Sequence, residues 1–166
     1  MEQQNTTLQY LTFELDKDIF ALEIGKVREV LDFTSVTKVP GCQEFMRGVI
    51  NLRGTVVPVM DMRRKLNMPA AENNTNTCII IVEIRVDESS VVVGAMADAV
   101  QEVLDLEPAD IEPPPRIGAK LNTDFIRGMG KRGEKFIIIL DIDRVFSVSE
   151  LAELSWNDPG SVAVNQ

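Results

Sequence analysis

The side chains that could do chemistry in this 166-residue chain do not include a single histidine. This excludes Ser-His-Asp and Cys-His catalytic pairs and removes the commonest transition-metal ligand. Cys42 and Cys78 lie too far apart for a C-x-x-C site, and without a secretion signal we expect two reduced thiols. The acidic residues could supply a paired-carboxylate hydrolase, but that chemistry uses an apolar pocket with stacking aromatics, and aromatic residues make up 5% of the chain. The residues therefore favour a protein without catalytic, metal or cofactor chemistry.

One phosphate-binding pattern, G-x-G-x-x-G, occurs at residues 128–133. A dinucleotide site needs a helix directly after this motif, with its N-terminus facing the pyrophosphate. Here the β-branched run at 136–140 follows, and it predicts a buried strand. We therefore expect these glycines to form a hairpin turn.

Charge and hydropathy narrow the set of partners. The net charge of −9 comes from 17 basic and 26 acidic residues, which disfavours nucleic acid and anionic lipid surfaces. Apolar runs such as 78–82 are far shorter than the ~20 residues needed to cross a bilayer, and the first ten residues lack a signal-peptide pattern. We expect a soluble, cytoplasmic chain that does not insert into a membrane.

The chain contains an imperfect internal repeat. Residues 45–64 match 125–144 at an offset of 80, and both read F-apolar-R-G, a turn, an apolar strand and Asp-apolar. Residues 27–32 match 100–105 at an offset of 73. Two matches in the same order indicate a duplication.

Each repeated unit is predicted to contain five strands joined by tight turns. The predicted strands are 8–15, 18–23, 26–33, 46–52 and 55–60 in the first unit, and 77–86, 90–97, 99–106, 125–131 and 135–140 in the second. So many short strands in about 75 residues are typical of a small closed barrel, because an open sheet would leave exposed edges. We therefore predict an all-β fold with two barrels, one from about 8–70 and the other from about 77–146, packed around a shared apolar seam.

Turn and cap residues support this division. Asp61 and Asp141 follow strands and are predicted to N-cap short helical turns. The remaining segments are predicted as a polar connector at 69–76, a stiff proline crossover at 113–115, a short C-terminal helix at 147–155 and a frayed tail at 157–166.

Arg53 is the first residue that local structure does not require. It lies in the turn Asn51-Leu52-Arg53-Gly54, where the glycine serves the turn but nothing local needs an arginine. It is either a functional side chain, an exposed turn residue or a salt-bridge partner of a nearby acid. Arg132 is expected to occupy the equivalent turn of the second unit.

The segment 22–33 is the second candidate, because Ile24, Val27 and Val30 leave apolar side chains around Glu29. An exposed apolar stripe marks a partner site, and the alternative is that these residues fill the seam between the barrels. A groove at this seam, rimmed by Glu29 and Arg53, would suit an amphipathic helix of a partner.

The run FMRGVINLRGTVVPVMDMRRKL at 45–66, with VREVL at 27–31 and DAVQEVLDL at 98–106, resembles the CheW family of bacterial chemotaxis coupling proteins. The resemblance covers residues 8–152 and implies one CheW-like domain over 1–166, built from two five-stranded SH3-like barrels with a short segment at 147–166. It implies a non-catalytic adaptor without cofactors, monomeric when free, that couples chemoreceptors to the chemotaxis histidine kinase CheA in membrane-associated arrays.

The resemblance also implies the binding residues. The receptor's helical hairpin tip would contact Ile24, Val27, Glu29, Arg53, Thr77 and Cys78, and the kinase regulatory domain would contact Val30, Val36 and Gly48. A second, ring-forming kinase contact would fall in the loop from Glu112 to Ile117, whose acid at 112 and aliphatic residue at 117 depart from the family pattern. The alternative function is a small-ligand-binding double barrel, which would contain a deep polar pocket in place of a shallow apolar groove.

Overall fold

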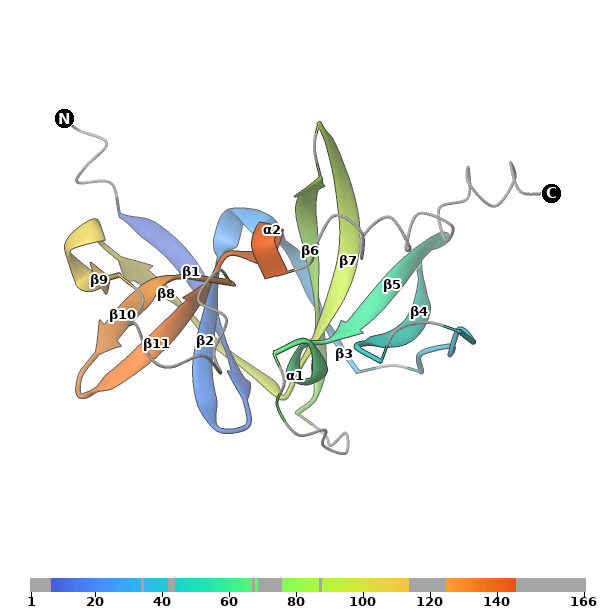
Figure 1. Ribbon diagram of the computed structural model, residues 1–166, viewed down its shortest axis with the longest axis horizontal. Coiled ribbons are helices and arrows are strands. Elements are labelled where there is room, and N and C mark those ends of the chain that lie inside the picture. Colours follow the sequence, from blue (N-terminus) through green and yellow to red (C-terminus); the bar gives the residue numbers. More distant parts are fainter. Residues whose placement is uncertain are drawn as a thin grey trace.

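The computed structural model describes residues 7–33, 35–41, 44–66, 68, 76–86, 88–113 and 125–145 (Figure 1). The strands are β1 (Leu8–Leu15), β2 (Asp18–Glu23), β3 (Val27–Asp32), β4 (Met46–Leu52), β5 (Thr55–Asp61), β6 (Cys78–Val86), β7 (Ser89–Ala97), β8 (Ala99–Leu106), β9 (Ile111–Glu112), β10 (Ile126–Arg132) and β11 (Lys135–Leu140). The helical turns are η2 (Ile24–Lys26), α1 (Met62–Lys65), η3 (Pro108–Asp110) and α2 (Ile142–Val145). The predicted all-β fold and all ten predicted strands are confirmed, and β9 is an addition.

The strands form two sheets that curl into SH3-like barrels. Barrel A has the order β8-β1-β2-β11-β10-β9, and barrel B has the order β3-β6-β7-β5-β4. Barrel A lies at the left of Figure 1 and barrel B at the right. Each barrel combines the first hairpin of one sequence unit with the later strands of the other unit.

This exchange corrects the prediction that residues 8–70 and 77–146 each close a barrel. Only Asp98 lies between β7 and β8, which is shorter than the two-residue loop of the tightest hairpins. Strand β8 therefore cannot fold back on β7, and it pairs with β1 in barrel A instead. In the same way η2 leads the chain from β2 in barrel A into β3, which pairs with β6 in barrel B.

Both barrels close in the same way. The segment that follows β8 in barrel A, or β3 in barrel B, pairs with the next hairpin along the chain. Strand β9 pairs with β10 in barrel A, and Thr37 bridges to Val49 of β4 in barrel B. Glycines allow this approach: a Cβ on Gly48 would lie 2.1 Å from the carbonyl oxygen of Thr37, and a Cβ on Gly128 would lie 2.9 Å from that of Glu112. The closures leave short, protected sheet edges.

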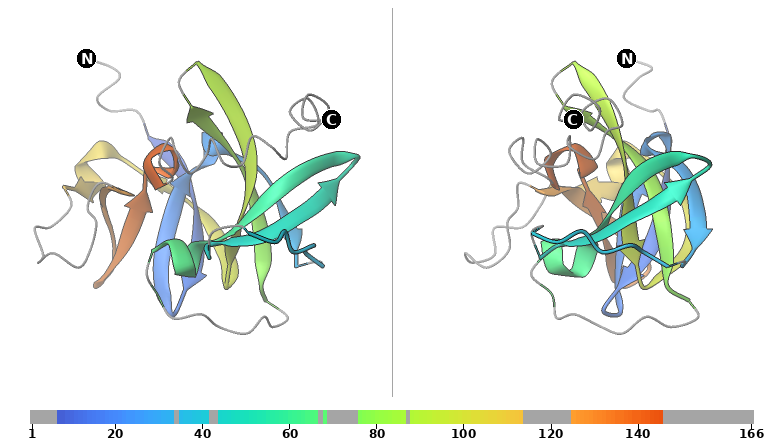
Figure 2. Two further views of the ribbon diagram at one scale, coloured as in Figure 1. Left: turned by 45° about the vertical axis from the view of Figure 1, so that its right-hand side comes forward. Right: turned by 90° about the vertical axis from the view of Figure 1, so that its right-hand side faces the viewer.

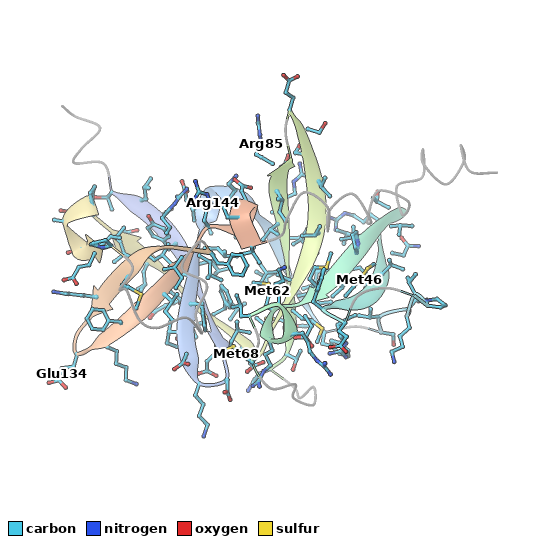
Figure 3. All side chains as sticks on the ribbon, viewed as in Figure 1. Met46, Met62, Met68, Arg85, Glu134 and Arg144 are labelled. Carbon is cyan, nitrogen blue, oxygen red and sulfur yellow. The ribbon has the colours of Figure 1, made fainter. Side chains whose placement is uncertain are left out.

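The core has three parts. One cluster lies within barrel B and one within barrel A, and the largest, which we call the central cluster, contains residues of both barrels and both α-helical turns. Met62 of α1 belongs to this central cluster and lies between the two sheets (Figure 3). The predicted apolar seam between the barrels is therefore confirmed.

The predicted caps are also present. The carboxylate of Asp61 accepts from the backbone N–H of Arg63 at 3.0 Å and of Arg64 at 3.4 Å. Asp141 accepts from the backbone N–H of Asp143 at 3.2 Å. The predicted helix and tail at 147–166 lie outside the described residues, as do most of the connector at 69–76 and of the proline crossover.

The two equivalent hairpin turns differ by one position from the prediction. Residues Arg53 and Gly54 form the loop of the β4–β5 hairpin, but Arg132 pairs with Lys135 and is the last residue of β10. Gly133, with φ of 63°, therefore occupies the place that Arg53 takes with φ of 50°. The expectation that Arg132 lies in the equivalent turn is wrong, because Arg132 is the strand residue that precedes that turn.

Candidate functional site

The first group of candidate residues lies where the chain passes from barrel A to barrel B. Ile24 belongs to η2, and Val27 and Glu29 belong to β3. Ile24 and Val27 are half-buried and pack against the central cluster. The two side chains thus contribute to the seam between the barrels, which was the alternative to an exposed partner site. They also present part of their surface to solvent.

Arg53 reaches this group from the tip of the β4–β5 hairpin. Its guanidinium donates to the Glu29 carboxylate, and we call these two residues the rim pair. The Arg53 side chain is 71% exposed and that of Glu29 30%, so the pair adds little to stability. The hydrogen bond to Glu29 raises the pKa of Arg53, which keeps the guanidinium charged.

The backbone at Arg53 is in the left-handed region, with φ of 50°, as it is at Asp16 and Lys17 in the β1–β2 turn. A left-handed conformation costs a non-glycine residue roughly 1–2 kcal/mol, and Gly133 avoids this in the equivalent turn. Asn51 supports the Arg53 turn by accepting from the N–H of Gly54 at 2.7 Å. The left-handed φ thus belongs to the tight turn, and the contact of the Arg53 side chain with Glu29 is a separate feature of this residue.

Thr77 and Cys78 lie elsewhere. They are at the start of β6, where Cys78 pairs with Asp32 at the far end of β3. Val27 pairs with Val82, four residues or about 13 Å further along β6. Both Thr77 and Cys78 are buried, so the structure places them neither at the surface nor beside Val27 and the rim pair.

The Cys78 thiol is chemically quiet. Burial raises its pKa to about 11, so the neutral thiol dominates at neutral pH. Within the described ranges, no three His, Cys, Asp or Glu side chains are grouped so as to hold a metal ion. In the same part of the chain, no helix has the length and hydrophobicity that a membrane span requires.

The residues assigned to kinase contact have three different environments. Val30 faces outward on β3 and is 41% exposed, while Val36 packs against the barrel B cluster. Gly48 is buried, with φ of 146° and no room for a side chain, so it shapes the backbone. Glu112 is exposed on β9 and lies 2.6 Å from the Lys131 ammonium. Ile117 lies outside the described residues.

The structure adds exposed apolar residues that sequence reasoning missed. Besides Val30, the described large hydrophobic side chains that are exposed are Leu8, Val56, Val103 and Phe136. Val30 and Val103 are equivalent under the offset of 73, and Val56 and Phe136 under the offset of 80. The repeat itself could have found them, because each pair occupies matching outward positions in the two units.

Comparison with known proteins matches this chain to one family. The model of the CheW-like domain matches residues 9–150. The chemotaxis protein CheW of Klebsiella aerogenes is 33% identical over 144 residues, which are 87% of this chain and 84% of that protein. The chemotaxis protein CheW of Bacillus subtilis is 32% identical over 136 residues, or 81% of this chain and 84% of the relative.

A solved structure agrees with these matches. The crystal structure of the scaffolding protein TtCheW from Thermoanaerobacter tengcongensis superposes with a TM-score of 0.77 at 34% identity. The match covers 87% of this chain and 96% of that chain. The similarity therefore extends over both barrels and over nearly the whole of the solved relative.

Proposed function

Because this chain belongs to the CheW family, we propose that it is a non-catalytic chemotaxis adaptor that couples chemoreceptors to the chemotaxis histidine kinase CheA. Members of the family are named as chemotaxis and scaffolding proteins, which supports an adaptor role. The observation that carries the finer proposal is Arg53, held in a left-handed turn and aimed at Glu29.

The receptor site that we propose is the surface formed by Ile24, Val27 and the rim pair. An amphipathic helix from the receptor tip would place its apolar face on Ile24 and Val27, and its polar residues against Glu29 and Arg53. The charges of the rim pair remain available because the pair is largely exposed. Thr77 and Cys78 would act from behind the surface, by supporting the far end of β3.

The kinase site that we propose begins at Val30 on the same strand. A bulge between Val27 and Glu29 interrupts the alternation of β3, so Val27 and Val30 pair with Val82 and Ile80 of the central cluster, whereas Glu29 pairs with Ile81 of the barrel B cluster. Val30 is 41% exposed, so the proposed kinase contact would adjoin the proposed receptor surface. Val30 would contact the kinase regulatory domain, and Val36 and Gly48 would set the shape of the surrounding backbone.

A second kinase contact at Glu112 to Ile117 completes the proposal. The carboxylate of Glu112 is already paired with Lys131, so a partner at β9 would meet a neutralised pair on this surface. Recruitment to membrane-associated receptor arrays and a monomeric free state follow from the proposed role. Adaptor contacts of this kind gain strength from many copies in an array.

The test is a pull-down and kinase assay with a receptor cytoplasmic fragment and the kinase regulatory domain. We expect wild-type protein to bind both, and Arg53→Ala to lose receptor-dependent kinase activity without losing thermal stability. Arg28→Ala is the matched control. Arg28 belongs to β3 and also forms an exposed ion pair, with Glu83 at 3.2 Å, so this variant removes an arginine without breaking the rim pair. Binding to neither partner would reject the coupling role and favour the small-ligand-binding alternative.

A further inference from the structure

Each passage of the chain between the barrels is fastened by a carboxylate that joins three elements. At the passage from β7 to β8, Asp98 accepts from the Arg63 guanidinium on α1, with Nε 2.9 Å from Oδ1. Asp98 also accepts from the backbone N–H of Asp16, at the tip of the β1–β2 hairpin, at 2.7 Å. We call this group the Asp98 junction.

The passage from β2 to β3 has a corresponding group, the Asp143 junction. The Lys26 ammonium, at the end of η2, lies 2.6 Å from Oδ2 of Asp143 on α2. The other carboxylate oxygen accepts from the backbone N–H of Arg85, near the tip of the β6–β7 hairpin, at 2.9 Å. In Figure 3 Arg85 is labelled on this hairpin above α2, the helix that carries Arg144, and in both views of Figure 2 the hairpin tip extends beyond the other strands.

The two junctions are similar in position, although the offset of 73 aligns Asp98 with Gly25, and they are opposite in charge. Asp98 and Lys26 are each the last residue before the third strand of their unit, and Arg63 and Asp143 are each the second residue of the helical turn after the fifth strand. In the Asp98 junction the passage is acidic and the helix basic, whereas the Asp143 junction reverses this. The duplicated fold thus uses the same fastening twice, with exchanged charges.

The Asp143 junction is the weaker of the two. Arg63 makes several hydrogen bonds to Asp98, and a guanidinium fork holds a carboxylate more rigidly than a single ammonium does. The Arg63 and Asp98 side chains are 13% and 25% exposed, whereas those of Lys26 and Asp143 are 26% and 28% exposed. No residue of η2 is buried, and Glu23 before it makes no side-chain capping bond. The position of η2 therefore depends on the packing of Ile24 against the central cluster and on the ion pairs at its two ends, Glu23 with Arg127 and Lys26 with Asp143.

We propose that Asp143 is a positioning residue for the receptor surface: through Lys26 it fixes η2 and the start of β3, so that Ile24 and Val27 are presented in one arrangement. This inference rests on the proposed function for its binding consequence. Asp143 belongs to the last described element of the second unit, whereas the surface it positions belongs to the first unit. The residue therefore acts across the interface between units without contacting the partner.

The test compares Asp143→Asn and Lys26→Met with Lys26→Arg, which keeps the positive charge opposite Asp143. Asparagine keeps an oxygen for the Arg85 N–H and removes only the charge that holds Lys26. Arg144→Gln is the control, because Arg144 is next to Asp143 on α2 and is 70% exposed. We expect Asp143→Asn and Lys26→Met to weaken receptor-fragment binding about 3- to 10-fold, as when the competent arrangement falls to a fraction of the population. Affinity for the kinase regulatory domain should stay within about twofold by the same relation, and Lys26→Arg should bind the receptor fragment like wild type.

Amide hydrogen exchange on the free protein tests the positioning without any partner. Residues 24–31 should exchange faster in Asp143→Asn than in wild type, while β8 should be unchanged. Equal exchange at 24–31 in the variant and in wild type would overturn the proposal. So would receptor binding that is equally tight in Asp143→Asn and in wild type. Loss of affinity for both partners in parallel with the melting temperature would also overturn it and leave a purely structural role. If wild type binds no receptor fragment, the proposed function fails, and the exchange result alone decides on the positioning of η2.

Discussion

Barrel A and barrel B close in the same way around different strands. Phe45 and Phe125 hold equivalent places, and their carbonyls accept from the N–H of Asp61 at 2.6 Å and of Asp141 at 2.8 Å. The two aromatic rings flank one ammonium, that of Lys65, at 5.0 and 5.6 Å from their centroids. The features that the repeat retains are therefore those that close the barrels and join them at the seam.

The barrels differ at their hairpin tips. Barrel B has Arg53 in its turn and Val56 beside it, whereas barrel A has Gly133 and Phe136 in the matching places. The rim pair in barrel B has no equivalent arginine in barrel A, because glycine stands there. The comparison teaches that this fold keeps its closure constant and varies its surface, so side-chain function should be sought where equivalent positions disagree.

Val82→Asp is expected to cause the largest loss of stability. It tests whether the two barrels can fold separately. Val82 is fully buried in the central cluster that both barrels share. An unpaired charge there should destabilise the protein by about 4 kcal/mol or more, and both barrels should unfold together in urea. NMR signals of a folded barrel A that survive in this variant would show instead that the barrels are independent.

Substituting the closure glycines compares the tolerance of the two barrels. Gly48→Ala should cost about 3 kcal/mol, because it combines a strained φ with a clash against backbone. Gly128→Ala should cost less, about 1–2 kcal/mol, since Gly128 lacks the positive φ of Gly48 and its Cβ would lie 2.6 Å from Cγ2 of Ile111 and 2.9 Å from the Glu112 carbonyl oxygen, against 2.1 Å from a carbonyl oxygen at Gly48. Urea unfolding of both variants measures the difference, and equal losses would contradict it.

Asp98→Asn tests the stronger junction through its pH dependence. Burial opposes the charge on Asp98, but the hydrogen bonds from Arg63 and from the Asp16 N–H outweigh it and lower the pKa of the carboxyl. The stabilisation is therefore present above the unfolded-state pKa near 3.8 and is lost as the pH falls through the lower folded-state pKa. At pH 7 the variant should be about 1–2 kcal/mol less stable.

The measurement is urea unfolding of wild type and Asp98→Asn at several pH values between 7 and about 3. The two stabilities should converge at the acid end. A constant difference across this range would mean that Asp98 acts through its shape and not through its charge. Asp143→Asn should show a smaller loss, about 0.5 kcal/mol, because its ion pair is single and more exposed.

Arg53→Gly is expected to have the smallest effect on stability, because it gives barrel B the turn of barrel A. The melting temperature should not fall, since glycine accepts the left-handed φ that Arg53 adopts. Receptor-dependent kinase activation should nevertheless be lost with the guanidinium. Full activity in this variant would remove Arg53 from the proposed receptor site and leave Ile24 and Val27 as its remaining apolar residues.

Local features were predictable from the sequence, and long-range pairing was not. Alternating apolar residues and turn residues located the strands to within two residues, because these signals act over short distances. The exchange between barrels was missed because the pairing of β1 with β8 joins residues that are far apart in the sequence, such as Tyr10 and Leu104. The single residue Asp98 between two strand patterns was nevertheless a usable signal, because it is too short a loop for a hairpin.

The candidate site was predictable in part for the same reason. Arg53 and Glu29 are in contact, and Ile24 and Val27 lie in the same passage between the barrels, but that the four residues form one receptor site stays a prediction. Thr77 and Cys78 were assigned through the family resemblance, and only the register of β3 against β6 places them at the far end of the strand. The mismatch of Arg132 with Arg53 arose because both turns contain an Arg-Gly pair, shifted by one position in the hairpin.

The exchange of hairpins has a consequence for synthesis on the ribosome. Barrel B uses residues from Val27 to Ala97, whereas barrel A needs β1 and also β11, which ends at Leu140. The first hairpin to emerge must therefore wait for the last strands, and a lone two-stranded hairpin is at best marginally stable in water. We expect barrel B to close first on the growing chain and barrel A to close only near its end, so the segment made first is among the last to find its partners.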